Sequence, residues 1–320
     1  MSNRSKIAWT DKTWNPVVGC GRVSTGCEHC YAEMSAARLA RIGRTAERYK
    51  GLTEVGAHGA RWTGIAREVP EMLDRPLRWK KPRLVFVNSM SDLFHDDISD
   101  EFILRVFDVM RSCLTAEANV WPESHAFQVL TKRPERMRDL MKRMRFDGRG
   151  TGTMSLHEPG TRDSGYGIMG GRPGCPPLPN VWLGVTAENQ EMADERIPLL
   201  LDTPAAVRFV SAEPLLGPID FEAMESKLDW IIVGGESGLG ARPCAVEWIR
   251  SIVEQCGESE VACFVKQLGA RPIFFPGDPI TGYEGIAQPI EQRHSKGGDP
   301  VEWPEDLRVQ EYPTTGEPGR

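Results

Sequence analysis

The chain has 320 residues, of which 40% are hydrophobic and 26% charged, and its formal net charge is −6 at pH 7. These values are typical of a soluble globular protein with one large domain or two ordinary ones, and they argue against a surface coated in basic residues for nucleic acid. No apolar run approaches the roughly 18 residues that span a membrane, and the opening segment MSNRSKIAWTDKTWNP lacks the apolar core of a secretory signal. Because the eight cysteines cluster rather than form a framework, we expect a cytoplasmic protein with no membrane contact.

Short apolar runs rich in β-branched residues recur along the chain and predict strands. They are Trp14–Val18, Leu84–Asn88, Phe127–Thr131, Val181–Thr186, Val207–Ala212, Trp230–Gly234 and Cys263–Lys266. Most are almost continuously apolar, as expected of parallel strands that are buried on both faces. The pattern therefore predicts about seven strands in one parallel sheet.

Helical patterns lie between these runs. Apolar residues recur at helical spacing in 102–114, 137–144 and 248–256, and a further helical stretch, AEMSAARLARI, covers 32–42. Strand, helix and strand in this order indicate βαβ units with right-handed crossovers. Seven such strands fit either an open doubly wound sheet or an incomplete barrel, and we expect an α/β fold with a partial or distorted (β/α) barrel of parallel strands.

Two regions fall outside this pattern. Residues 147–180 contain nine glycines and five prolines without hydrophobic periodicity, which predicts an irregular insertion, either a lid or a disordered segment. Residues 276–320 are again rich in Pro, Gly and charge, with Trp303 as the main anchor, and predict a C-terminal tail that wraps the surface. The expected organisation is a barrel domain in 1–275 followed by this tail.

Polar residues follow nearly every predicted strand. They are Asn88, Ser89, Ser91, Asp92, Thr131, Lys132, Arg133, Thr186, Glu188, Asn189, Ser211, Glu213, Gly235, Glu236, Ser237, Lys266 and Gln267. Active sites of parallel α/β folds lie at the carboxyl ends of the strands. These residues therefore predict one shared site at that end of the sheet, which we call the mouth. The structural alternative is that strand ends are polar simply because they are exposed.

Three cysteines, Cys20, Cys27 and Cys30, lie within eleven residues near the start of the chain, in the run GCGRVSTGCEHCYAE. Two cysteines that are two residues apart can hold one metal centre from a tight turn, and the neighbouring glycines let a third reach the same point. Three thiolates leave one coordination position open, as a reactive centre requires. The cysteines therefore predict a small metal site that follows the first strand.

Three interpretations of this cysteine site compete. The first is a [4Fe–4S] cluster with one iron free for a small ligand. The second is a structural zinc site, which would need a fourth ligand from His29, His58, Cys175 or Cys244. The third is a set of unligated thiols within a core. The absence of a second Cys-x2-Cys or His pair from the sequence favours the cluster.

The segment TWNPVVGC…GCEHCYAE resembles a phage- and prophage-associated family of radical S-adenosylmethionine (SAM)-like proteins whose substrate is unsettled. The resemblance continues in order from Ile7 to Ala270, through the blocks VFVNSMSDLFH, VLTKRPERM, WLGVTAEN, RFVSAEPLLGPI and WIIVGGESGLGARP. The C-x6-C-x2-C spacing differs from the C-x3-C-x2-C of most radical SAM enzymes, and the Gly-rich stretch carries the weakest match.

The resemblance implies a radical SAM-like barrel with a [4Fe–4S] cluster and SAM as cofactors. Cys20, Cys27 and Cys30 would hold three irons, and the amino and carboxylate groups of SAM would chelate the fourth. An external donor would reduce the cluster, and the 5′-deoxyadenosyl radical released from SAM would take a hydrogen atom from the substrate. Tyr31 resembles the aromatic that packs near the adenine. The implied location is the cytoplasm, that of a bacterial host cell if a phage encodes the protein.

Candidate cofactor and catalytic residues follow from position. Asn88, Ser89, Ser91 and Asp92 at the end of the second strand are expected to contact SAM, and the Thr131 hydroxyl to bind its ribose. Gly234 and Gly235 let the backbone approach a ligand, or else form a tight turn. The candidate catalytic side chains at the mouth are Glu213, Glu236 and Lys266, and Glu213 is also a candidate for binding the cofactor.

Two basic runs keep nucleic acid as a candidate partner. One consists of Lys132, Arg133, Arg136, Arg138, Lys142, Arg143 and Arg145, and the other of Arg75, Arg78, Lys80, Lys81 and Arg83. The alternative for each run is a solvated helix face. The leading hypothesis is a radical SAM enzyme that modifies or repairs a nucleic-acid base, and the rival is a non-catalytic binding module that a metal stabilises.

The remaining cysteines divide into two groups. Cys113, Cys256 and Cys263 fall on apolar stripes or in a strand and are expected in the core. Cys175 and Cys244 lie in predicted loops, where either could donate a hydrogen atom to a substrate radical or have no chemical role.

Overall fold

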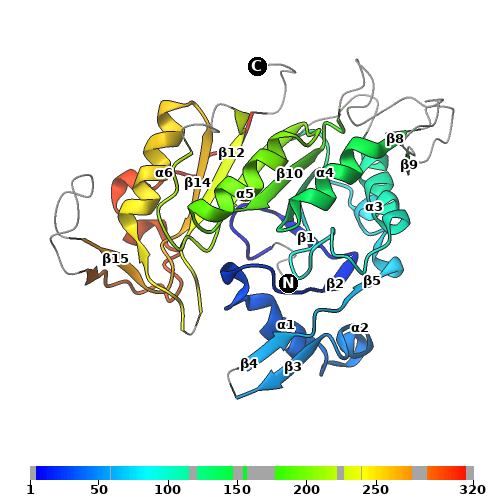
Figure 1. The fold of residues 1–320 in the computed structure, drawn as a ribbon, viewed down its shortest axis with the longest axis horizontal. Coiled ribbons are helices and arrows are strands. Elements are labelled where there is room, and N and C mark those ends of the chain that lie inside the picture. The colour runs from blue at the N-terminus through cyan, green and yellow to red at the C-terminus, as the bar shows by residue number, and fades with distance from the viewer. Residues whose placement is uncertain are drawn as a thin grey trace.

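A computed structural model describes residues 5–57, 59–114, 121–146, 154–156, 177–221, 227–238, 240–275 and 287–314. Its centre is a seven-stranded sheet with the order β1-β6-β7-β10-β11-β12-β14, in which every neighbouring pair is parallel. Each strand lies beside the preceding strand of this sheet, and the strands curve into part of a barrel (Figure 1). The prediction of a partial (β/α) barrel is confirmed at this level.

The strands lie where the apolar runs predicted them. Their bounds are β1 Lys12–Trp14, β6 Leu84–Val87, β7 Ala126–Thr131, β10 Val181–Thr186, β11 Val207–Ala212, β12 Trp230–Gly234 and β14 Ala262–Gln267. The predicted first strand, Trp14–Val18, is wrong in detail because the chain leaves the sheet at Asn15 and Pro16. Its second half is β2 (Val17–Gly19), which pairs antiparallel with β5 (Ala66–Glu68) and leads directly to Cys20. Proline has no N–H for a sheet ladder, which favours this break.

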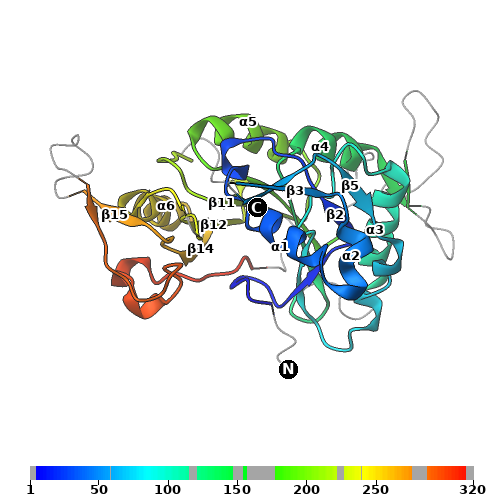
Figure 2. The same cartoon turned by 90° about the horizontal axis from the view of Figure 1, so that it is seen from below.

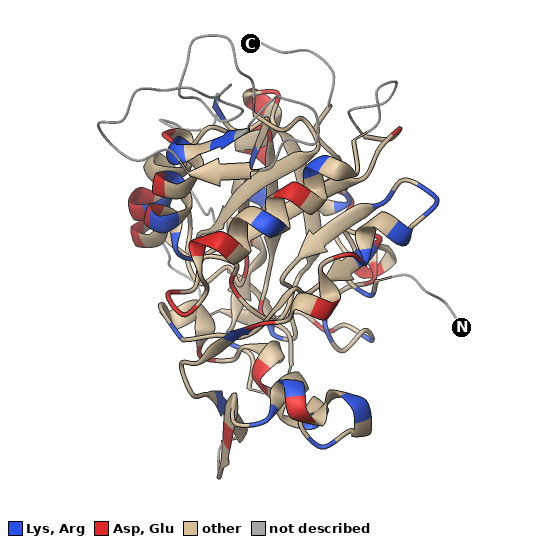
Figure 3. Ribbon diagram, turned by 90° about the vertical axis from the view of Figure 1, so that its right-hand side faces the viewer, with Lys and Arg blue, Asp and Glu red and all other residues tan. Residues whose placement is uncertain are grey.

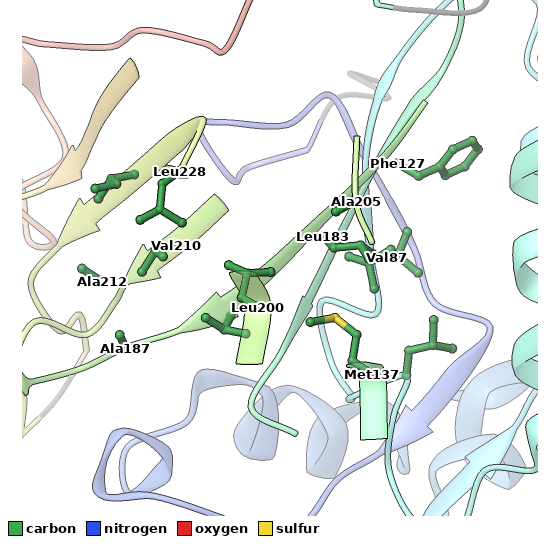
Figure 4. Packing of buried hydrophobic residues seen from close by; sticks show 14 of the residues in the cluster. Val87, Phe127, Met137, Leu183, Ala187, Leu200, Ala205, Val210, Ala212 and Leu228 are labelled. Carbon is green, nitrogen blue, oxygen red and sulfur yellow. The ribbon is translucent and has the colours of Figure 1, made fainter. Parts of the chain in front are cut away.

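Four helices follow strands of the sheet and pack on its outer face: α3 (Asp100–Ser112), α4 (Pro134–Arg143), α5 (Gln190–Leu201) and α6 (Val246–Glu258). Their buried residues join the outward side chains of the strands in one core, part of which Figure 4 shows around Leu183, Val210 and Met137. The three predicted apolar stripes correspond to α3, α4 and α6. No helix was predicted for the residues that form α5. Helix α5 begins where the Asn189 side chain accepts a hydrogen bond from the Met192 N–H.

The inner face of the sheet carries an aromatic core instead of further strands. Phe86 from β6, Trp182 from β10, Phe209 from β11 and Trp230 from β12 pack together with Trp9 from the N-terminal segment. From the C-terminal segment, Tyr312 lies 5.5 Å from Trp230 between ring centroids, and the Glu311 carbonyl accepts the Trp230 indole N–H at 2.9 Å. The two terminal segments thus fill the open side of the half-barrel. This two-sided burial explains why the strands are almost continuously apolar.

A small module covers the carboxyl ends of the strands (Figures 1 and 2). It consists of α1 (Tyr31–Leu39), α2 (Ala46–Tyr49) and the hairpin of β3 (Thr53–Gly56) and β4 (Gly59–Trp62). Ala36, Tyr49 and Leu52 form its own buried cluster with Val18 from β2. The helix over 32–42 was predicted, whereas the hairpin was not.

The irregular regions are described only in part. Met154–Leu156 (β9) pairs antiparallel with Met144–Phe146 (β8), and residues 177–180 lead into β10. The lid-or-disorder interpretation concerns 147–180, of which 147–153 and 157–176 lie outside the described residues. In the tail, Gln288–Pro289 (β16) pairs with Pro272–Phe274 (β15), which also pairs with Cys244–Ala245 (β13). Trp303 in the tail is buried in the main core. None of the described helices combines the length and apolar character that crossing a bilayer needs.

Candidate functional site

A pocket of about 260 Å³ lies at the carboxyl ends of six strands of the sheet and is bounded on one side by the cysteine loop. Its volume is far larger than one ion or one water needs. Among the predicted site residues, its lining includes Cys20, Cys27, Cys30, Tyr31, Asn88, Ser89, Ser91, Asp92, Thr131, Glu213, Gly235, Glu236 and Lys266. Gly234 does not line it. A Cβ at Gly234 would lie 3.1 Å from Glu213 Oε1, so this glycine leaves room for the Glu213 carboxylate.

The cysteine loop runs from the end of β2 to the start of α1. At its entry, Gly19 has a φ of +85° and a Cβ there would lie 2.2 Å from the Ile65 carbonyl oxygen, so only glycine fits. Cys27 ends a short 3₁₀ turn, Thr25–Cys27, and Cys30 is the N-cap residue of α1. Cys20, Cys27 and Cys30 are free thiols, each partly exposed to the pocket.

Burial sets the ionisation of two of these thiols. Burial, together with the nearby Asp92 carboxylate and against the opposing effect of Arg133, raises the pKa of Cys20 to about 12. Burial also raises the pKa of Cys30, although the Ala32 N–H and the Trp62 side chain, which hydrogen bond to its sulfur, act in the other direction. Such thiols become thiolates when a positive centre binds them.

The donor set fits an iron–sulfur centre. In the described part of the chain, no three His, Cys, Asp or Glu side chains form a group that could hold a single metal ion. Three unpaired cysteine thiols that face one pocket are nonetheless the ligands that iron–sulfur clusters use. His29, a candidate fourth zinc ligand, instead places Nδ1 2.9 Å from Glu236 Oε2. His58 and Cys175 fall outside the described residues.

Glu236 ties the end of β12 to the cysteine loop. Its carboxylate accepts hydrogen bonds from Arg242 Nη2 at 2.6 Å and from the Arg242 backbone N–H at 2.8 Å, in addition to the His29 contact. Arg242 also donates to the Thr25 carbonyl at 2.9 Å. Burial alone would raise the pKa of Glu236, but these donors outweigh it and the pKa lies below its usual value. Both carboxylate oxygens are engaged, which suits a positioning residue better than a catalytic one.

Glu188 makes a second link, from the end of β10. It is fully buried and pairs with Lys132 Nζ and, at 3.1 Å, with Arg196 Nη1, while Ser24 Oγ in the cysteine loop donates to it at 2.8 Å. A Cβ at Gly26 would lie 2.2 Å from Glu188 Oε1, so this glycine in the loop makes room for the carboxylate. Glu188 was predicted to lie at the mouth, but no pattern in the sequence predicts its contact with Ser24.

The residues that follow β6 include polar groups with hydrogen-bond partners and one polar group without. Asp92 accepts hydrogen bonds from the Thr131 hydroxyl, the Lys132 N–H and Arg133. The Asp92 carboxylate and the Thr131 hydroxyl are therefore already hydrogen bonded to each other. The Ser91 hydroxyl donates to the Val17 carbonyl at 2.8 Å. Asn88 differs: the residue belongs to the pocket lining and its Oδ1 accepts the Val17 N–H, but its buried Nδ2 has no hydrogen-bond partner. A buried, unpaired donor of this kind indicates a ligand acceptor or a bound water.

Glu213 and Lys266 both line the pocket and form an ion pair. Lys266 Nζ lies 2.7 Å from Glu213 Oε1, and both side chains retain partial exposure. The pair offers a ligand one positive and one negative group at the ends of β11 and β14. Tyr31 at the start of α1 also lines the pocket, and its hydroxyl donates to the Ser89 carbonyl.

Cys113, Cys244, Cys256 and Cys263 are not among the residues that line the pocket. Cys256 and Cys263 are buried in the main core and Cys113 packs against it, as predicted. Cys244 is buried in β13 rather than in an open loop, because its side chain belongs to the same core. Cys175 falls outside the described residues.

The two predicted basic runs differ in their surroundings. Five residues of the first run form ion pairs, Lys132 with Glu188, Arg133 with Asp92, Arg136 with Asp100, and Arg138 and Lys142 with Asp202. Acidic and basic residues interleave over the helices in Figure 3. The second run is exposed at Arg75, Arg78, Lys80 and Lys81, but it precedes β6 and therefore lies at the amino ends of the strands, away from the pocket.

Residues 4–279 match the model of a protein family that is described as Protein of unknown function (DUF5131). The matched range includes the whole sheet and every residue that lines the pocket. No curated protein and no solved structure matches the chain.

Proposed function

Since the chain belongs to the DUF5131 family of proteins of unknown function, its function has to be inferred from the site, and we propose that it is a radical SAM iron–sulfur enzyme. One observation carries the proposal: three free thiols on one loop line the same pocket as polar side chains from six strand ends. Cys20, Cys27 and Cys30 would hold a [4Fe–4S] cluster. When bound, this cluster supplies the electron that cleaves SAM to methionine and a 5′-deoxyadenosyl radical, which removes a hydrogen atom from the substrate.

The residues of the chain itself bind and orient the ligand, and they exclude water. The unpaired Asn88 Nδ2 would donate to a ligand carboxylate, and the Glu213–Lys266 pair would match the charges of an amino-acid end. Glu188 and Glu236 hold the cysteine loop against the strand ends, so the thiols keep their places before a cofactor binds. In this proposal the small module above the mouth would limit the access of water.

We propose a nucleic-acid base as the substrate. Trp9, Phe86 and Leu130 contribute an apolar wall to the pocket, against which a flat base would pack. The basic residues Lys132 and Arg133 line the same pocket, although each is paired with a carboxylate.

A second candidate is a non-catalytic module that a metal stabilises and that binds nucleic acid or a protein. The observation that favours it is the density of contacts on the cysteine loop, because Glu188, Glu236 and Arg242 already fasten the loop to the sheet. In this case the metal would complete a fold and the pocket would perform no chemistry.

Anaerobic reconstitution separates the two candidates. The enzyme is expected to bind about four iron and four sulfide per chain, to absorb near about 400 nm, and to release 5′-deoxyadenosine when dithionite and SAM are added. Bound zinc without SAM cleavage would favour the module and refute the enzyme. If the substrate proposal is correct, an added RNA or DNA oligonucleotide speeds the release of 5′-deoxyadenosine, and no response to any oligonucleotide counts against it.

A further inference from the structure

A second hollow lies on the outer side of α1, between this helix and the β3–β4 hairpin. Its volume is about 290 Å³, and it is lined by Met34, Ala37, Arg38, Arg41, Ile42, Val55 and Ala60. We call it the α1 groove. The cofactor pocket does not include any of these residues, so the groove is a separate surface.

The floor of the α1 groove is apolar and open to solvent. Met34 and Val55 are each 59% exposed and Ile42 is 45% exposed, although all three are large hydrophobic residues. Exposed apolar side chains that gather in a hollow mark interaction sites more often than isolated ones do. Methionine adapts its shape to a partner because its side chain is unbranched and flexible.

The rim of the groove is positively charged. Arg38 and Arg41 are exposed, and neither forms an ion pair within the part of the chain that the structure describes. Residues 31–69 contain seven arginines and lysines against four glutamates, a net charge of +3, whereas the whole chain carries −6. A basic rim on an acidic protein favours an acidic partner and steers its approach.

The groove is also close to the cysteines. Cys30 is the N-cap of α1, and Met34 lies one helical turn further on, a rise of about 6 Å along the axis. Tyr31 and Ala32 line the cofactor pocket while Met34 and Ala37 line the groove, so α1 separates the two by its own width. A partner seated in the groove would therefore lie next to the centre that the cysteines hold.

We propose that the α1 groove docks a small acidic electron-transfer protein, which reduces the centre held by Cys20, Cys27 and Cys30. This inference rests on the proposed function. The partner's own cofactor loses one electron and the cysteine-bound centre gains it, with no other reactant. Weak redox complexes use small interfaces, and an apolar floor with an arginine rim is the composition of a protein–protein contact. Nucleic acid is the less favoured occupant because the groove lining contains no aromatic side chain on which a base could stack.

The test compares two reductants in the reconstituted protein. The variant Arg38→Glu/Arg41→Glu reverses the rim charge, and Arg75→Glu/Arg78→Glu makes the same charge change at exposed residues outside both linings. The release of 5′-deoxyadenosine is measured with dithionite, and separately with reduced flavodoxin as an acidic donor protein. The binding of flavodoxin and of a single-stranded oligonucleotide to each variant is measured by titration.

With flavodoxin, the rim variant is expected to lose about tenfold or more in rate at low salt, because rim charges govern the association rate. With dithionite its rate should equal that of the unmodified protein, and the control variant should resemble the unmodified protein with both reductants. Equal rates of rim variant and unmodified protein with flavodoxin overturn the docking proposal. Loss of oligonucleotide binding with unchanged flavodoxin turnover assigns the groove to nucleic acid and also overturns it. No 5′-deoxyadenosine with dithionite refutes the proposed function itself, and this inference with it.

Discussion

Ser24 Oγ donates a hydrogen bond of 2.8 Å to Glu188 Oε1, across 164 residues of sequence. The contact joins the cysteine loop, which follows the first strands, to the end of β10 in the middle of the sheet. Glu188 is fully buried, and its charge is balanced by Lys132 and Arg196. The position of the thiols therefore depends on a carboxylate far away in the chain.

Replacing Glu188 by Gln tests this dependence. The change leaves Lys132 and the buried Arg196 without their counter-charge, and removing one partner of a buried ion pair typically costs about 3–5 kcal/mol. We expect the free energy of unfolding, measured by urea denaturation at pH 7, to fall by an amount of this order. Asp306→Asn, which removes an exposed partner of Arg250, serves as the control and should change it little. Equal effects of the two changes would contradict the role given to Glu188.

The same carboxylate predicts a pH dependence. Burial by itself raises the pKa of Glu188, but Lys132 and Arg196 outweigh it, so the pKa in the folded state lies below the usual 4.5. The stability that Glu188 contributes is therefore complete above pH 4.5 and is lost as the pH falls through the lower folded-state pKa. The gap between the urea midpoints of the unmodified protein and Glu188→Gln, measured from pH 7 to 3, should be constant above pH 4.5 and narrow below it. A gap that stays constant over this range would exclude the effect.

Gly26 offers a steric test of the same contact. A Cβ at this position would lie 2.2 Å from Glu188 Oε1, so Gly26→Ala must displace the loop or the carboxylate. Overpacking of this kind costs about 1–3 kcal/mol, and we expect less bound iron after reconstitution because Cys27 is the next residue. Gly56→Ala is the matched control, since a Cβ there meets no atom within 4 Å. Iron content per chain, measured for both variants, decides the point.

The sheet was predictable from the sequence and the links across the mouth were not. Continuous apolar runs such as Val181–Thr186 predict buried parallel strands because both faces of the sheet are covered. Helix α5 was not predicted because it contains Pro198 and its apolar stripe is weak. Its N-cap residue, Asn189, is equally compatible with a loop. Arg242 was not predicted because its partner Glu236 and the Thr25 carbonyl come together only in three dimensions. The aromatic inner face depends on Trp9 and Tyr312, which no local pattern brings together.

The three cysteines of the loop should behave as one set. Because each is expected to hold a different iron, Cys20→Ala, Cys27→Ala and Cys30→Ala should each abolish or strongly reduce the absorption near about 400 nm and the bound iron. Cys113→Ala removes a thiol that packs against the core outside the pocket, and it should retain both. Metal analysis after anaerobic reconstitution measures the outcome. A full iron content in any of the three loop variants would rule out that residue as a ligand.

Asn88 should contribute more to SAM binding than its neighbour Ser91. The Asn88 Nδ2 donor is buried and unpaired, whereas the Ser91 hydroxyl is already bound to the Val17 carbonyl. Asn88→Asp keeps an oxygen for the Val17 N–H and tolerates the φ of +59°, but it replaces the donor by a negative charge. A hydrogen bond to a charged group is worth about 1.5–3 kcal/mol, so the Kd for SAM should rise roughly tenfold to a hundredfold. Ser91→Ala should leave the Kd nearly unchanged. Equilibrium dialysis with labelled SAM measures both, and circular dichroism checks that each variant is folded. If the two changes weaken binding equally, the unpaired donor of Asn88 is not the group that holds the ligand.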